Sequence, residues 1–174
     1  MMGYAPLVYR FARRRGLQDA DAADLTQEVL QAVAAGSRRL EYDPARGTFR
    51  GWLFTVARNR LHNFLLRQRR YAERHPQPDS PRGLDDQPSS SAQTDDEQDL
   101  WEQEYRRRLF DWAAERVRVG FHDSTWQAFW RTAVEGQSAR EVAQALGLSV
   151  GAVYIAKSRV LARLREQIQE LQAD

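Results

Sequence analysis

The sequence has no cysteine and only one lysine, Lys157. The lack of cysteine excludes disulfides and thiol chemistry and is typical of a reducing cytoplasm. No apolar run approaches the length of a bilayer span, so we expect a cytoplasmic protein with no membrane insertion and no signal peptide before the first helix. Because the chain has only one lysine, arginine carries almost all of its positive charge. Its guanidinium suits phosphate and guanine edges, although a GC-rich coding sequence would also explain this usage.

Charge is distributed unevenly along the 174 residues, although the formal net charge is only +2. Between residues 46 and 74 the arginines face a single acid, Glu73, and such a local field suits phosphates. Residues 79–99 are acidic, with only Arg82 against them. This second stretch belongs to a longer segment that is rich in proline and serine and nearly free of apolar residues. Such a segment cannot build a core, so it is typical of a tether.

Hydrophobic periodicity predicts helices on both sides of this tether and no strands. The fold class is therefore all-α, with two small helical domains joined by a flexible acidic linker. We expect a three-helix N-terminal lobe over residues 1–74, the linker over 75–98 and a C-terminal lobe over 99–174. The expected helices of the N-terminal lobe cover residues 4–15, begin again at Asp19 or Asp21 and stop at Gly36, and run from a Thr48 cap to about Tyr71. The aromatic residues expected to pack the C-terminal lobe are Trp101, Trp112, Trp126 and Trp130.

A helix-turn-helix pattern occupies residues 138–165. Ser138 and Glu141 form an S-x-x-E capping box at the start of the first helix. Gly147 stands where a left-handed residue ends a helix, and Ser149 can cap the next one. The residues expected to pack inward from the second helix are Val153, Ala156, Val160 and Leu164. This pattern favours DNA reading, and the alternative is an ordinary helical hairpin with a solvated basic surface.

Three stretches together resemble one family. The N-terminal lobe contains DADAADLTQEVLQAV and then FRGWLFTVARNRLHNFLLRQRR, and the helix-turn-helix lies within residues 126–166. These stretches resemble regions 2 and 4 of the bacterial RNA polymerase sigma factors of the small extracytoplasmic-function type. The resemblance implies a protein without catalytic, cofactor or metal residues. It implies that the chain binds core RNA polymerase and directs it to promoters, recognising the −10 element with region 2 and the −35 element with region 4.

The resemblance also implies partners and site residues. The partners are the clamp coiled coil of the largest polymerase subunit and the polymerase flap, double-stranded and melted promoter DNA, and in many members an anti-sigma factor. The residues implied for polymerase binding are Asp24, Leu25, Gln27, Glu28 and Leu30. Those implied for the −10 element and the single strand are Tyr42, Asp43, Arg46, Phe49, Arg58, Asn59, Arg60, Asn63, Arg67, Arg69 and Arg70. Those implied for the −35 element are Ser149, Tyr154, Ile155, Lys157, Ser158, Arg159 and Arg163.

Three other interpretations concern a DNA-binding regulator, a metal-dependent nuclease and a masking linker. A helix-turn-helix regulator that does not associate with core polymerase would explain residues 138–165 but not the N-terminal lobe. A metal-dependent nuclease would need clustered ligands, whereas His62, His75 and His122 are scattered along the chain. The acidic stretch 79–99 also suggests, from charge complementarity, a linker that folds back on the arginine-rich lobe and masks it.

Overall fold

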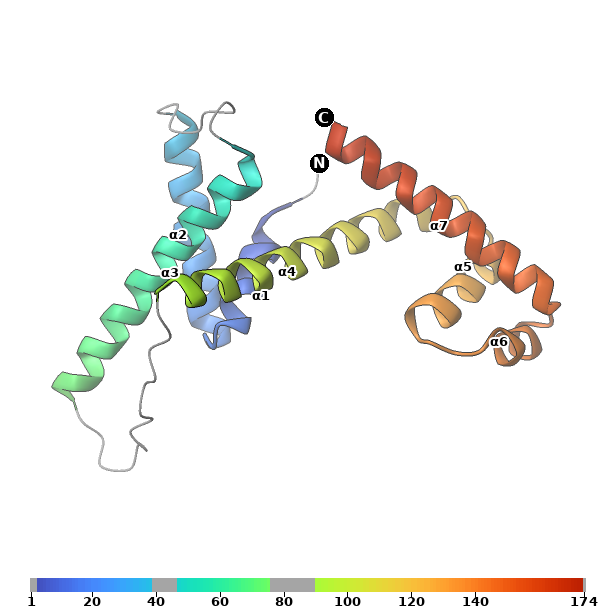
Figure 1. The fold of residues 1–174 in the computed structure, drawn as a ribbon, viewed down its shortest axis with the longest axis horizontal. Helices are drawn as coiled ribbons and strands as arrows, with labels where there is room; N and C mark the ends of the chain where they lie inside the picture. The colour runs from blue at the N-terminus through green and yellow to red at the C-terminus, as the bar shows by residue number, and fades with distance from the viewer. Residues whose placement is uncertain (1–2, 39–46, 76–89, 174) are drawn as a thin grey trace. The chain divides into compact units, whose positions relative to one another are not determined.

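The computed structural model describes residues 3–38, 47–75 and 90–173. All regular elements within these ranges are helices, which confirms the all-α prediction (Figure 1). The chain forms two compact units, Gly3–Tyr105 and Arg106–Asp174, which we call the N-terminal and C-terminal units.

The N-terminal unit contains α1 (Ala5–Arg14), α2 (Asp19–Arg38) and α3 (Phe49–Arg74). Helix α2 packs against both α1 and α3. Apolar residues at helical spacing meet at its centre, as expected for amphipathic helices that bury one face. The residues of this core that are at most 1% exposed include Leu7, Phe11, Leu25, Val29, Leu53 and Leu61.

The ends of these helices follow from local sequence with one exception. Thr48 caps α3, because its hydroxyl accepts a hydrogen bond from the backbone N–H of Gly51 at 3.1 Å. The expected stop of α2 at Gly36 is wrong, since the helix continues to Arg38. Glycine within a helix costs only about 1 kcal/mol relative to alanine, so a single glycine does not force an end.

Helix α4 (Ser90–Arg118) begins inside the segment expected to be a linker and contributes to both units. Its first half completes the core of the N-terminal unit. Trp101 is 1% exposed, and its ring lies 5.4 Å from that of Phe11 and 5.7 Å from that of Phe54. The assignment of Trp101 to the C-terminal lobe is therefore wrong, and residues 90–98 are helical. The division between the units follows Tyr105, whereas the sequence suggested residue 98.

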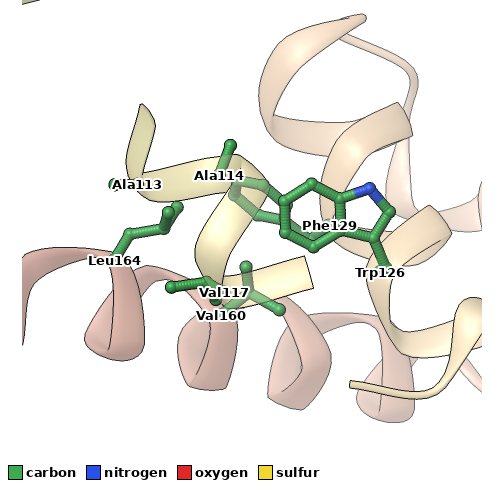
Figure 2. Packing of buried hydrophobic residues seen from close by; sticks show 7 residues of the cluster. All are labelled: Ala113, Ala114, Val117, Trp126, Phe129, Val160 and Leu164. Carbon is green, nitrogen blue, oxygen red and sulfur yellow. The ribbon is translucent and has the colours of Figure 1, made fainter. Parts of the chain in front are cut away.

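The C-terminal unit combines the second half of α4 with α5 (Asp123–Phe129), a π-helical turn (Trp130–Val134), α6 (Ala139–Leu146) and α7 (Val150–Ala173). Its larger core joins α4, α5 and α7, as Figure 2 shows. The buried side chains of this core are Ala113, Ala114, Val117, Trp126, Phe129, Val160 and Leu164. Trp112 and Trp130 are partly buried against it, so these two tryptophans and Trp126 pack where the sequence predicts.

Within the described ranges, no single helix is long and apolar enough to cross a membrane. The pair α6 and α7 reaches the required length and composition only when taken together, across a bend of 102°.

Candidate nucleic-acid interface

The turn between α6 and α7 is built by its capping residues. The Ser138 hydroxyl accepts a hydrogen bond from the Glu141 backbone N–H at 3.2 Å, and the Glu141 carboxylate accepts one from the Ser138 N–H at 3.3 Å. Gly147 ends α6 with a φ of +66°. Ser149 then accepts a hydrogen bond from the N–H of Ala152 at 3.1 Å. The predicted capping box, left-handed glycine and second cap are all confirmed, and they fix the angle between the two helices.

The outer face of α7 is open. The four residues predicted to pack inward are buried, whereas Tyr154 and Ile155 are 59% and 60% exposed. These two large side chains are exposed to solvent, so they are available to contact thymine methyl groups and deoxyribose. Arg163 pairs with Glu166 at 2.9 Å on the same helix. The other residues implied for the −35 element are the exposed Ser149, Ser158 and Arg159 and the half-buried Lys157.

The turn glycine gives a direct test of this geometry. Gly147→Ala is expected to destabilise the C-terminal unit by about 1 kcal/mol, because an alanine in the left-handed region meets its own carbonyl. No atom lies within 4 Å of the added Cβ, so the cost is conformational only. Thermal unfolding measures the change. Gly151→Ala is the matched control, since Gly151 lies inside α7 with ordinary space around it, and this variant is expected to be at least as stable as the parent. Equal stabilities of the two variants would contradict the role of Gly147.

On the N-terminal unit, α3 presents an exposed polar face. Asn59 and Asn63 are exposed and lie one turn apart on the helix, so their amides project in similar directions. Asn63 also lines an open depression of about 460 Å³. The side chains lining the depression are Glu28, Arg60, Asn63, Leu66, Arg67 and Arg70. Amides that both donate and accept, next to several guanidinium groups, are suited to a base edge and its flanking phosphates.

Comparison with known proteins identifies the family. Residues 1–71, which include α1, α2 and most of α3, match the family model for Sigma-70 region 2. Over 98% of its length the chain is 31% identical to RNA polymerase sigma factor CarQ of Myxococcus xanthus, and the match covers 88% of that protein. This chain belongs to the RNA polymerase sigma factors of the extracytoplasmic-function type. The resemblance read from its motifs is confirmed.

The structure exposes most of the α2 residues that were expected to bind polymerase but buries one of them. Asp24 and Gln27 are exposed, and Glu28 and Leu30 are partly exposed. Leu25 is only 1% exposed because its side chain packs in the core of the N-terminal unit. Leu25 therefore cannot present its side chain to a partner. The expectation that Leu25 belongs to the polymerase contact surface is corrected.

The residues expected to contact the −10 element also differ in their placement. Tyr42, Asp43 and Arg46 lie outside the described residues. Phe49 packs at the start of α3, with its ring 5.2 Å from that of Tyr4 and 5.7 Å from that of Trp52. Arg60, Arg67, Arg69 and Arg70 are exposed on α3, although Arg67 lies 3.8 Å from Glu28 across the depression.

Arg58 does not lie on the open face of α3. Its Nε donates a hydrogen bond to Glu97 of α4 at 3.0 Å, and its Nη2 donates to the Thr94 hydroxyl at 2.7 Å. With its side chain 25% exposed and its guanidinium held by Glu97 and Thr94, Arg58 faces α4 in this conformation and not an open phosphate site. The expectation that Arg58 is exposed and ready to contact phosphate is therefore corrected.

Sequence reasoning missed Glu97 and its partners in this sigma factor. Glu97 was included in an acidic tether, but it lies one turn before Trp101 on the buried side of α4. The spacing of four residues between Glu97, Trp101 and Tyr105 is the signal that could have revealed a helical face. The basic partners are Arg15, which follows the end of α1, and two residues of α3, and local sequence does not show them.

The histidines do not form a metal site. His62 contacts Glu97, His75 stacks on Tyr71 with ring centroids 4.5 Å apart, and His122 precedes α5. In the parts of the chain that the structure describes, no three histidine, aspartate or glutamate side chains are placed to hold a metal ion.

Proposed function

We propose that this sigma factor binds core RNA polymerase in the cytoplasm and directs it to promoters that carry a −10 and a −35 element. The N-terminal unit takes the −10 element as melted single strand, and the C-terminal unit takes the −35 element as duplex. The chain supplies specificity and has no active site of its own, because the polymerase performs the chemistry. The observation that supports this best is the open face of α7 on a capped helix-turn-helix, in a chain whose first 71 residues match Sigma-70 region 2.

Each unit offers a surface suited to its proposed ligand. Helix α7 can enter a major groove with Tyr154 and Ile155 toward base edges and Arg159 toward a phosphate. These side chains favour apolar contact with thymine over bidentate guanine reading. On α3, Asn59 and Asn63 are proposed to hold an unstacked base, with Arg60, Arg67 and Arg70 along the strand.

The proposed polymerase contact uses the exposed part of α2. Asp24, Gln27 and Glu28 provide acidic and amide groups, and Leu30 provides partly exposed apolar area. Such a surface suits the basic clamp coiled coil of the largest subunit, because its charges steer encounter while the apolar side chain adds burial.

Run-off transcription tests the proposal. Purified core polymerase is given fragmented genomic DNA of the source organism, with and without this protein, and the start sites are mapped. We expect new start sites that share two spaced upstream elements only when the protein is present. DNA binding without any new initiation would favour instead a helix-turn-helix regulator that does not associate with core polymerase.

A further inference from the structure

A buried carboxylate lies at the junction of α1, α3 and α4. Glu97 is 1% exposed and receives three basic groups. Its oxygens lie 2.9 Å from Nη2 of Arg15, 3.0 Å from Nε of Arg58 and 2.8 Å from Nε2 of His62. We call these four residues the Glu97 cluster. Several donors that converge on one anionic group from two helices form an anion site, here filled by a side chain of the same chain.

The anion site has spare donor capacity. Nε of Arg15 is buried and has no hydrogen-bond partner within the described ranges. A backbone phosphodiester carries two anionic oxygens, as a carboxylate does, but holds them on a tetrahedral group that reaches donors out of the carboxylate plane. The donors of the Glu97 cluster therefore suit a phosphate at least as well as the carboxylate that they hold.

The segment of α4 that carries Glu97 contributes little apolar area to the core. Residues 90–99 contain no apolar side chain larger than that of Ala92, and the buried anchor of the helix is Trp101. Helix ends fray locally at far lower cost than global unfolding, because they bury little apolar surface. Opening of the first turns would release Glu97 and the hydrogen bond from Arg58 to Thr94, while Trp101 stays packed against Phe11 and Phe54.

An open groove of about 750 Å³ adjoins the Glu97 cluster between α3 and α4. Tyr71 is 67% exposed at its edge, so its ring offers a stacking surface. Guanidinium groups beside an exposed aromatic ring are the combination that binds single-stranded nucleic acid without base specificity. Arg15, Arg69 and Tyr71 line the groove, together with Asp96 and Glu97 of α4.

We propose that this groove and the adjoining Glu97 cluster together form a second track for single-stranded nucleic acid, separate from Asn59 and Asn63, in which Arg15, Arg58 and His62 bind a backbone phosphate. Glu97 occupies the phosphate position when no strand is bound, so the first turns of α4 compete with nucleic acid for the track. The inference rests on the proposed binding of melted DNA by the N-terminal unit, and it gives Arg58 a conditional role in place of the constitutive one expected from sequence.

The test measures binding of a fluorescent oligothymidine to the full chain over a range of salt concentrations. Glu97→Gln removes the competing charge, and Asp99→Asn removes one charge from an exposed position on the same helix as the matched control. We expect Glu97→Gln to bind about fivefold more tightly than Asp99→Asn. The slope of log K against log salt should steepen by about 0.7, the value for one added phosphate contact on a single strand. Adding Arg15→Gln or Tyr71→Ala to Glu97→Gln should cancel the gain.

Thr94→Ala covers the possibility that Glu97→Gln does not fold. This variant removes the hydroxyl that accepts the hydrogen bond from Arg58 and leaves every buried charge in place, so it should raise affinity in the same direction by a smaller factor. Equal affinities of Glu97→Gln, Thr94→Ala and Asp99→Asn, with reduced thermal stability of Glu97→Gln, would overturn the inference and leave a structural ion cluster. Wild-type run-off transcription is scored separately. New start sites with wild-type protein, but no gain in oligothymidine affinity in Glu97→Gln, would refute the second track alone. A gain in affinity without any new start sites would refute the promoter-directing function alone.

Discussion

Replacement of Trp101 by alanine is expected to lower the free energy of unfolding of the N-terminal unit by about 4 kcal/mol, the typical cost of losing a buried aromatic side chain. Trp101 is 1% exposed and packs edge-on against Phe11, and the Phe54 ring contacts both of them. Alanine would leave a cavity bounded by two rings on different helices, which cannot close around it. Because most small domains are only 5–15 kcal/mol stable, we expect this single change to leave the unit partly unfolded near physiological temperature.

Trp101→Phe is the matched control. Phenylalanine keeps most of the aromatic packing and removes the indole N–H, which is buried without a hydrogen-bond partner in the described structure. The loss should be about 1 kcal/mol or less. Amide hydrogen exchange locates the effect: in Trp101→Ala we expect protection to fall in α1 and α3 and to persist in α7. Loss of protection in α5 and α7 instead would show that Trp101 packs in the C-terminal unit, as the sequence pattern suggested.

Local chemistry made the helix-turn-helix predictable. Its capping box, its left-handed Gly147 and the inward register of α7 depend on interactions within about four residues, and such interactions can be read directly from sequence. The same holds for Thr48 at the start of α3. Leu25 and Val29 of α2 stand four residues apart, a spacing typical of one helix face, and both lie in the core. The conflict at Leu25 arose only when the family's contact surface was transferred to a position that this fold buries.

The start of α4 could not be predicted from local sequence because contacts with residues far away in the chain stabilise it. Residues 90–99 have the acidic, nearly apolar-free composition of a tether, and such a segment gains little by folding alone. It is helical beside Trp101, and Glu97 meets Arg15, 82 positions earlier in the chain, and Arg58, 39 positions earlier. Burial of this carboxylate is possible because its partners neutralise it. Charge complementarity in the sequence did indicate an acidic segment against a basic lobe, but it did not indicate which acid or which face of α3.

Loss of both amides on α3, in Asn59→Ala with Asn63→Ala, is expected to reduce promoter-directed initiation by about a hundredfold. An amide that binds a base edge contributes about 1–3 kcal/mol of discrimination, so loss of two should cost about 3 kcal/mol. Both side chains are exposed and neither packs in the core, so the fold should not change. Run-off transcription from a mapped promoter measures the effect.

Two measurements separate base recognition from the other roles of the N-terminal unit. The double variant should still bind core polymerase with parental affinity, because Asp24 and Gln27 lie on α2 and are unchanged. Gln169→Ala with Gln172→Ala removes two exposed amides from the last turns of α7 and should leave initiation unaffected. Permanganate footprinting of the promoter should then show that the α3 variant assembles on duplex DNA but fails to hold the melted strand. Normal melting with reduced transcription would instead place the defect after strand separation and argue against base capture by Asn59 and Asn63.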